Sequence, residues 1–244
     1  MIIIDKYKCG YQTVPKSGST SVCHYFAGIL GVQKIKRYNS IGQTLRNEWS
    51  RGHGIIPEDY YVFCFVRNPW ARLVSAHYEF IKYYHGVAKG WRGAIAQNEK
   101  WAREGKLTIP EMMEFMSSKD APPSFDDFVD FVINIEQQHG VPNAHWAPQC
   151  QKLRIFRHED KKRMMRISDY DFIGKLETFE KDLKHVAGVI GSPIDKAPWE
   201  HKHLANSGRT YEDFYTNQKM IDDVGKHYEE DIDKFKYTFK YDID

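Results

Sequence analysis

The chain has 244 residues, of which 41% are hydrophobic and 14% aromatic, so it can form a sizeable core and is not intrinsically disordered. Its 35 basic and 33 acidic residues give a formal net charge of +2, which argues against nucleic acid or an anionic membrane surface as the main partner. The four cysteines are widely spaced and form no CxxC pair, so we expect buried or free thiols and no zinc site.

The N-terminal part of the chain alternates strand and helix patterns. A strand is predicted over residues 6–14, followed by a turn and a helix from about residue 19 to Gly31. A short strand at 34–38 and a helix at 41–49 are expected next.

Residues 60–66 form the clearest strand, because their nearly continuous apolar run is typical of a central strand covered on both faces. Asn68 and Pro69 end this strand, and an amphipathic helix follows. Repeated strand, turn and helix predict an α/β fold with a parallel sheet.

The second half of the chain contains further α/β elements. Ser124 is a suitable N-cap for a helix, a strand is expected within 166–176, and Thr178 begins another helix. Apolar residues over 221–235 predict one long amphipathic helix at the C-terminal end.

A polar stretch at about 86–123 interrupts this pattern, and we interpret it as an acceptor-side insertion or lid within a single domain of residues 1–244. The three isoleucines at 2–4 are too few for a signal peptide or a membrane span, and no later segment approaches a span. The chain is therefore expected to be cytoplasmic as it stands.

The segment 15–21, Pro-Lys-Ser-Gly-Ser-Thr-Ser, lies between a predicted strand and a predicted helix. Backbone N–H groups at a helix N-terminus form an anion site, Gly18 permits close approach, and Lys16 adds positive charge. Hydroxyl groups that can donate to phosphate come from Ser17, Ser19, Thr20 and Ser21. The order of residues matches neither GxxxxGK[ST] nor GxGxxG, and a serine-rich turn with a helix cap is the structural alternative.

Arg67 lies at the carboxyl end of the best predicted strand, where ligands of open α/β sheets bind. Ser75 follows eight residues later, about two turns into the next helix. Both side chains can reach one phosphate, and the guanidinium offers a planar set of donors. The alternative is a structural arginine that satisfies carbonyl groups at the strand end.

Together these two segments resemble the PAPS-dependent sulfotransferases, closest to the carbohydrate branch that modifies chondroitin, dermatan and related glycans. The family patterns are PK-x-G-[ST]-[ST]-[ST] and R-[DN]-P-x-x-R-L-x-S, which residues 15–21 and 67–75 match. Two later segments, 145–149 (His-Trp-Ala-Pro-Gln) and 170–179, also resemble that branch, as does the ending 228–237.

The resemblance implies a P-loop-like three-layer α/β fold with a central parallel sheet flanked by helices. It also implies in-line transfer of a sulfuryl group from 3'-phosphoadenosine 5'-phosphosulfate (PAPS) to a hydroxyl acceptor, with PAP as product and no metal. In this family the first motif holds the 5'-phosphosulfate and the second the 3'-phosphate, so Lys16 is expected on the leaving oxygen and Arg67 with Ser75 on the 3'-phosphate. A late loop often closes over the nucleotide, where Arg209 is expected to add to the site.

The general base is expected among three side chains. His53 precedes the strand at 60–66, as the catalytic histidine does in related glycan sulfotransferases, and histidine has a suitable pKa. His145 is the second candidate, with holding the acceptor as its other role, and Glu79, one turn after Ser75, is the third.

The acceptor is expected to be a glycan, with a small molecule such as a secondary metabolite, or a protein tyrosine, as the alternatives. Trp91, Trp101 and Trp146 can stack on sugar rings or pack in the core. Family members of the Golgi carry a membrane anchor, so the Golgi lumen is expected if such an anchor preceded this chain. Two other classes stay open: a small-molecule kinase with an unusual phosphate loop, and a non-catalytic protein that binds a nucleotide or glycan.

Overall fold

A computed structural model describes residues 1–32, 45, 56–90, 92–104, 108, 111–112, 114, 122–135, 143–154, 164–194, 196 and 208–240. The chain divides into two compact units, each assembled from separate stretches of sequence. The first unit comprises 1–67, 148–202 and 242–244, and the second comprises 68–147 and 203–241. The single domain with a lid at about 86–123 stays a prediction.

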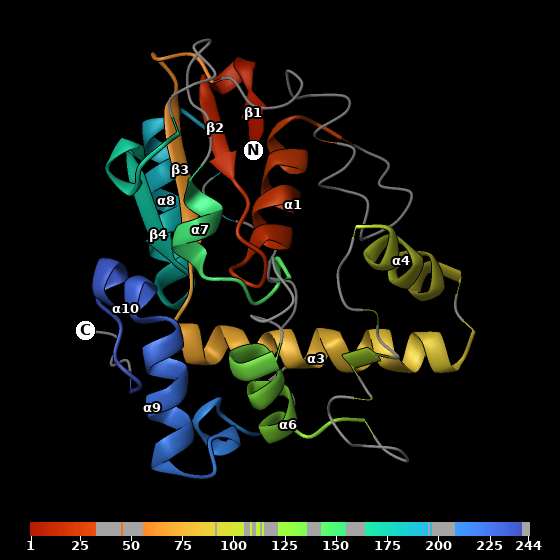
Figure 1. The fold of residues 1–244 in the computed structure, drawn as a ribbon. Helices are drawn as coiled ribbons and strands as arrows, with labels where there is room; N and C mark the ends of the chain where they lie inside the picture. The colour runs from red at the N-terminus through yellow and green to blue at the C-terminus, as the bar shows by residue number, and fades with distance from the viewer. Residues whose placement is uncertain are drawn as a thin grey trace. The chain divides into compact units, whose positions relative to one another are not determined.

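The first unit is built on a four-stranded sheet in the order β1-β2-β3-β4 (Figure 1). Its strands are β1 (Ile2–Ile4), β2 (Cys9–Gln12), β3 (Tyr61–Val66) and β4 (Phe172–Lys175). Strands β2, β3 and β4 are parallel, whereas β1 pairs antiparallel with β2. The predicted parallel sheet and its central strand are confirmed. The short edge strand β1 was not predicted, because three residues carry no recognisable periodicity.

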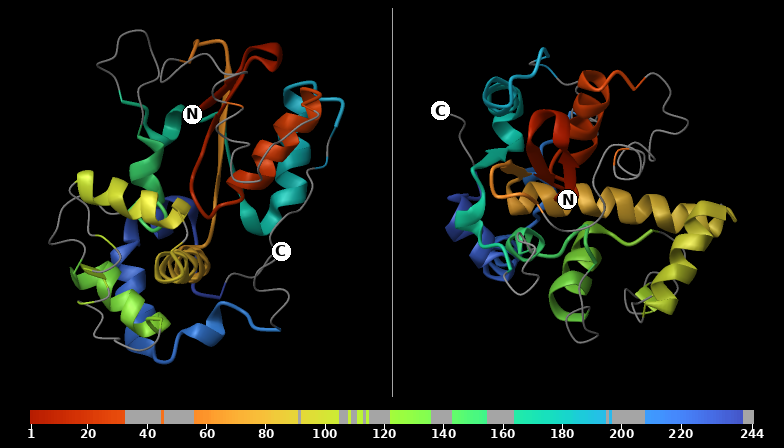
Figure 2. Two further views of the ribbon diagram at one scale, coloured as in Figure 1. Left: turned by 90° about the vertical axis from the view of Figure 1, so that its right-hand side faces the viewer. Right: turned by 90° about the horizontal axis from the view of Figure 1, so that it is seen from above.

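Helices lie on both faces of this sheet and make three layers (Figure 2). On one face are α1 (Ser19–Ile29) and α8 (Phe179–Val189), and on the other is α7 (Gln149–Leu153). The α1 and α8 face is packed with aromatic rings: Tyr11 and Phe63 have centroids 5.3 Å apart, and Phe65 and Phe179 are 4.9 Å apart. These rings alternate along β2 and β3, as a strand facing a helix layer requires.

The second unit is helical. It contains α3 (Pro69–Ala88), α4 (Arg92–Arg103), α6 (Phe125–Asp130), the π-helical turn η4 (Phe131–Ile135), α9 (Gln218–His227) and α10 (Glu229–Phe235). Helices α6 and α9 pack against α3 and against each other. The described residues also include four short 3-10 turns: Asp5–Tyr7, Ile167–Asp169, Leu176–Thr178 and Glu212–Phe214.

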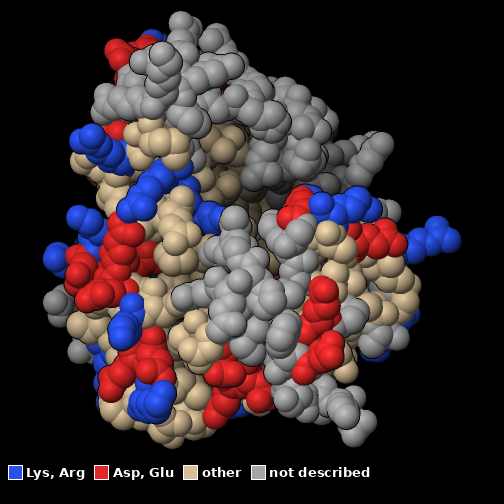
Figure 3. All heavy atoms as spheres, in the orientation of Figure 1, with Lys and Arg blue, Asp and Glu red and all other residues tan. Residues whose placement is uncertain are grey.

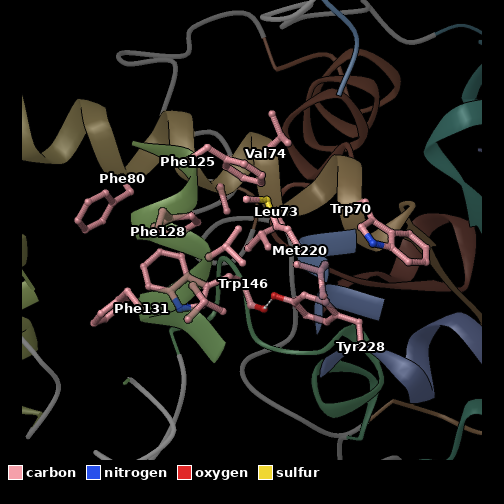
Figure 4. Packing of buried hydrophobic residues seen from close by; sticks show 14 of the residues in the cluster. Trp70, Leu73, Val74, Phe80, Phe125, Phe128, Phe131, Trp146, Met220 and Tyr228 are labelled. Carbon is pink, nitrogen blue, oxygen red and sulfur yellow. Dashed lines mark hydrogen bonds between the residues drawn. The ribbon is translucent and has the colours of Figure 1, made fainter. Parts of the chain in front are cut away.

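Aromatic and aliphatic side chains from these helices fill one core, which Figure 4 shows from close by. Trp146 lies at its centre and is 2% exposed. Its indole has centroid distances of 5.2 Å to Phe128 and 6.3 Å to Phe80. Trp101 is 4% exposed in the same core. Both indoles therefore pack inside the unit, and of the three tryptophans considered for sugar stacking only Trp91 lies outside the described residues.

Two predicted helix starts are confirmed with their caps. The Asn68 side chain accepts the N–H groups of Trp70 and Ala71 at 3.0 and 3.4 Å, and Pro69 occupies the first helical position. Ser124 and Asp127 form a reciprocal capping box at the start of α6.

The prediction of one long C-terminal helix is wrong. Two helices, α9 and α10, meet at Tyr228, whose φ of −106° and ψ of 24° depart from helical geometry. The tyrosine ring is buried and its hydroxyl donates to the carbonyl oxygen of Trp146 at 2.5 Å, the dashed line in Figure 4. The apolar periodicity continues through Tyr228 and gives no sign of this break, which lies at a residue held by a tertiary hydrogen bond.

The predicted strand at 34–38 and helix at 41–49 fall outside the described residues, apart from buried Leu45. Within the part of the chain that is described, no helix combines the length and the apolar character that crossing a bilayer requires. Lys, Arg, Asp and Glu side chains are interspersed on the face drawn in Figure 3, in keeping with the near balance of charge.

Candidate functional site

The turn between β2 and α1 contains the predicted phosphate loop. Its backbone is held by Val14, whose carbonyl oxygen accepts Ser17 N–H at 3.3 Å and the Ser19 hydroxyl at 2.7 Å. The hydroxyl of Tyr11, from β2, donates to Ser19 Oγ at 3.3 Å. The loop is therefore fastened to the strand before it and to the helix after it.

Lys16 and Gly18 both have positive φ, 68° and 79°, whereas Ser17 between them does not. Backbone of alternating handedness turns successive N–H groups toward one side, which is the geometry of an anion-binding nest. The left-handed conformation costs a lysine about 1–2 kcal/mol, so its presence here marks a constrained loop. Gly18 also has a packing reason, because a Cβ would lie 2.8 Å from Leu176 Cδ1.

The hydroxyls of Ser17 and Ser19 are engaged within the protein. Ser17 is fully buried and donates to Gln149 Oε1 at 3.0 Å, and Ser19 donates to Val14 as described. The first N–H groups of an α-helix have no intrahelical acceptor, so those of α1 are the groups that the loop offers to an anion. This differs from the expectation that all four hydroxyls donate to phosphate.

Arg67 follows β3 directly, and its Nη1 donates to the carbonyl oxygen of Lys16 at 3.4 Å. The arginine of the second motif thus reaches the loop of the first motif, although 51 positions separate them. Phe65 and Val66 pair with Gly174 and Lys175 of β4, which places Arg67 at the carboxyl end of the parallel strands. The structure therefore brings Lys16 and Arg67 together in the first unit, with Arg67 at the strand end where the sequence placed it.

Sequence reasoning gave no role to Gln149, the first residue of α7. Its side chain is fully buried, and its Oε1 accepts the Ser17 hydroxyl and the Arg67 N–H, while its Nε2 donates to the Arg67 carbonyl oxygen. The signal in the sequence was its place in the segment 145–149, which resembles the carbohydrate branch.

Three predicted binding and catalytic residues belong to the second unit. Ser75 and Glu79 lie on α3, one turn apart. The Arg209 guanidinium lies over the Phe214 ring at 4.1 Å, and its Nη2 donates to the Asp213 carbonyl oxygen at 3.0 Å. Joint phosphate binding by Arg67, Ser75 and Arg209 stays a prediction.

His145 also lies in the second unit, in the turn near the end of residues 68–147. Asn143 Oδ1 accepts the backbone N–H of His145 at 3.0 Å, so the amide atom that faces the ring is oxygen. His145 Nδ1 lies 3.1 Å from the same oxygen and must carry the proton. The neutral ring is thereby held as the Nδ1–H tautomer, with Nε2 unprotonated. His53, the other histidine candidate, lies outside the described residues.

Arg72, the second arginine of the motif at 67–75, has a structural position in the second unit. It is 1% exposed, and its guanidinium donates to the carbonyl oxygens of Ala147 at 2.9 Å and Ala144 at 3.3 Å. Burial lowers the pKa of Arg72, and the charges of Tyr228 and Asp231 partly offset this. Arg72 therefore shapes the turn that carries His145.

In the described part of the chain, no group of three or more His, Cys, Asp or Glu residues has a metal-binding arrangement. All four cysteines are buried free thiols, which confirms the prediction made from their spacing. Burial raises the pKa of Cys9 to about 12 and also raises that of Cys64.

A nest-like loop before a helix, joined to an arginine at the carboxyl end of a parallel strand, is an arrangement that can hold a phosphorylated ligand. Comparison with known proteins gives the class: the chain belongs to the sulfotransferase family, whose model matches residues 1–238. No solved structure matches it significantly.

Curated relatives are carbohydrate sulfotransferases of low identity. Carbohydrate sulfotransferase 8 of Mus musculus is 24% identical over 205 residues, which cover 79% of this chain and 44% of that protein. Carbohydrate sulfotransferase 9 of Homo sapiens is 24% identical over 254 residues (98% and 49%). Carbohydrate sulfotransferase 11 of Rattus norvegicus is 28% identical over 167 residues (66% and 41%). The chain spans less than half the length of these relatives.

Proposed function

We propose that this protein transfers a sulfuryl group from PAPS to a hydroxyl group of a carbohydrate. The observation that carries the proposal is the junction of the two phosphate motifs, where the Arg67 guanidinium donates to the Lys16 carbonyl oxygen beside the N-terminus of α1. Membership of the sulfotransferase family supports the reaction, and the names of the relatives support a carbohydrate acceptor.

The loop residues have separate tasks in this proposal. Backbone N–H groups of residues 18–21 hold the 5'-phosphate, because they form the positive end of α1. The N–H of Ser17, predicted for the same task, donates to the Val14 carbonyl oxygen. The Lys16 ammonium group stabilises charge on the oxygen that leaves sulfur. Arg67 holds the 3'-phosphate through its planar donors, with Ser75 and Arg209 as further donors.

The reaction needs a proton acceptor for the attacking hydroxyl. We assign this task to His145, because the Asn143 contact keeps Nδ1 protonated, which makes Nε2 the basic nitrogen of the neutral ring. A bond forms between the acceptor oxygen and sulfur, and the bond from sulfur to the bridging oxygen breaks. The electron pair stays on the 5'-phosphate of PAP, and the proton moves to Nε2. His53 and Glu79 are the alternatives for this role.

Transfer of radiolabelled sulfate from PAPS tests the proposal. Desulfated chondroitin and dermatan are the first acceptors, with a simple phenol as an acceptor of another class and ATP in place of PAPS as the cofactor control. Labelled glycan that forms with wild type and is lost in Lys16→Ala supports the proposal. Lys184→Ala is the matched control, because Lys184 is an exposed lysine of α8. Phosphate transfer from ATP would show a kinase, and PAP binding without transfer to any acceptor would show a non-catalytic nucleotide-binding protein.

A further inference from the structure

Gln149 is a fully buried primary amide that contacts both phosphate motifs at once. Its Oε1 accepts the Ser17 hydroxyl at 3.0 Å and the Arg67 N–H at 2.9 Å, and its Nε2 donates to the Arg67 carbonyl oxygen at 2.8 Å. These three partners come from segments 132 and 82 positions away in the sequence.

The two bonds to Arg67 reproduce the pairing that a neighbouring strand would provide. Strand β3 ends at Val66, so the Gln149 amide continues its hydrogen bonding by one residue. The orientation of the amide is fixed, because a backbone N–H can only donate and a backbone carbonyl can only accept. The remaining lone pair of Oε1 then accepts the Ser17 hydroxyl.

This arrangement sets the distance between the two segments that a nucleotide with two phosphate groups would contact. Ser17 lies in the loop assigned to the 5'-phosphate, and Arg67 is the residue assigned to the 3'-phosphate. One buried amide group joins them, so the spacing between the Ser17 loop and the backbone of Arg67, from which the guanidinium extends, is fixed before a ligand binds. Pre-organised spacing raises affinity because less freedom is lost when the ligand binds.

We propose that Gln149 is a positioning residue that fixes the spacing between the two phosphate-binding segments. Because its side chain is fully buried, it acts through Ser17 and Arg67 and makes no contact of its own with the nucleotide. The inference rests on the proposed function, since it assumes a ligand with phosphates at both segments.

Calorimetric titration of PAP into four proteins tests this: wild type, Gln149→Leu, Ser17→Ala and Tyr170→Phe. We expect the Kd for PAP to rise about tenfold in Gln149→Leu and about threefold in Ser17→Ala. Tyr170→Phe is the matched control, because Tyr170 donates a buried hydrogen bond of 2.8 Å to Leu153 at the other end of α7. Its Kd should stay within about twofold of wild type.

The double variant Ser17→Ala with Gln149→Leu should bind PAP no more weakly than Gln149→Leu alone, because Ser17 acts through Gln149. Gln149→Glu adds a readout that a purely structural role would not change. The ionised carboxylate has no donor for the Arg67 carbonyl oxygen, whereas the protonated form has one. The ratio of its Kd to the wild-type Kd at the same pH should therefore approach one as the pH falls from about 8 to about 5.5. The nearby positive charges of Lys16 and Arg67 oppose this protonation.

Circular dichroism and thermal unfolding show first which variants are folded. A folded Gln149→Leu that binds PAP as wild type does overturns the inference and leaves the proposed function intact. If Gln149→Leu does not fold, an unchanged Kd in folded Ser17→Ala overturns it equally. Absence of PAP binding by the wild type instead overturns the proposed function, and the inference with it.

Discussion

His145 Nδ1 lies 3.1 Å from Asn143 Oδ1, and the same oxygen accepts the backbone N–H of His145 at 3.0 Å. One buried amide thus sets both the backbone of the turn and the tautomer of the ring. A catalytic base oriented by a third group is a common arrangement in enzymes, because the orienting group keeps the reactive nitrogen unprotonated.

Asn143→Ala should lower kcat about tenfold and leave the Kd for PAP unchanged, because it removes the acceptor that fixes the ring and not a nucleotide contact. His145→Ala should lower kcat by about a hundredfold or more. His185→Ala is the matched control, since His185 is an exposed histidine of α8. Steady-state kinetics on these variants checks the prediction, and wild-type kcat in His145→Ala would exclude His145 as the base.

Arg72→Leu should lower the free energy of unfolding by about 3 kcal/mol, because it leaves the carbonyl groups of Ala144 and Ala147 without their buried donor. Arg72→Lys should recover little of this loss, since one ammonium group cannot reproduce the planar pair of donors. Urea unfolding followed by tryptophan fluorescence measures both, and Trp146 reports on the same turn. Stability equal to wild type in Arg72→Leu would contradict the structural role.

The stability of the second unit should decrease in acid through His77. Burial lowers the pKa of His77, with its bond to the Pro123 carbonyl oxygen and the charge of Asp127 offsetting part of this. Its Nδ1 is buried and has no hydrogen-bond partner within the described residues. In the unfolded chain the pKa of His77 is about 6.5, so near and below that pH the unfolded chain binds more protons than the folded protein. Stability therefore falls as the pH decreases from about 6.5 toward the folded pKa of His77.

His77→Gln tests this assignment, because glutamine keeps a donor for the Pro123 carbonyl oxygen and does not titrate. The midpoint of thermal unfolding should fall less between about pH 7 and about pH 5 in this variant than in wild type. Part of the dependence should remain, since burial also lowers the pKa of His227. An identical pH dependence in both proteins would show that His77 does not contribute.

The native thiols should react slowly with a disulfide reagent near neutral pH. All four cysteines are buried, and the raised pKa values of Cys9 and Cys64 keep both groups as the unreactive thiol. We expect fewer than one thiol per molecule to react rapidly in the folded protein, and all four to react in denaturant. The absorbance of the released product counts the thiols that have reacted. Rapid reaction of a folded thiol would show that its segment opens.

The sequence predicted the elements whose signals are local. The apolar run at 60–66, the strand end at Asn68, the cap Ser124 and the loop at 15–21 each depend on neighbouring residues, and the structure has them where expected. Non-local contacts were not predictable: Gln149 finds its partners in two distant segments, and the bond of Tyr228 to Trp146 spans 82 positions.

The candidate site divides in the same way. Arg67 was placed at the carboxyl end of its strand because ligands of α/β sheets bind where parallel strands end, which is a rule of topology. Its contact with the Lys16 carbonyl oxygen was not predicted. Gln149 and Asn143 were missed because nothing in the sequence distinguishes a buried amide that orients a neighbour from an exposed one. The roles of Ser75, Arg209 and His53 stay predictions.

Calorimetric titration of PAP, with ADP as the control, into wild type and Arg67→Ala tests the central claim most directly. The account predicts that wild type prefers the 3'-phosphorylated nucleotide and that Arg67→Ala loses this preference by about tenfold or more. Lys175→Ala, an exchange of another basic residue at the carboxyl end of a neighbouring strand, should keep the preference. Equal binding of PAP and ADP by wild type, or binding of neither, would contradict the account.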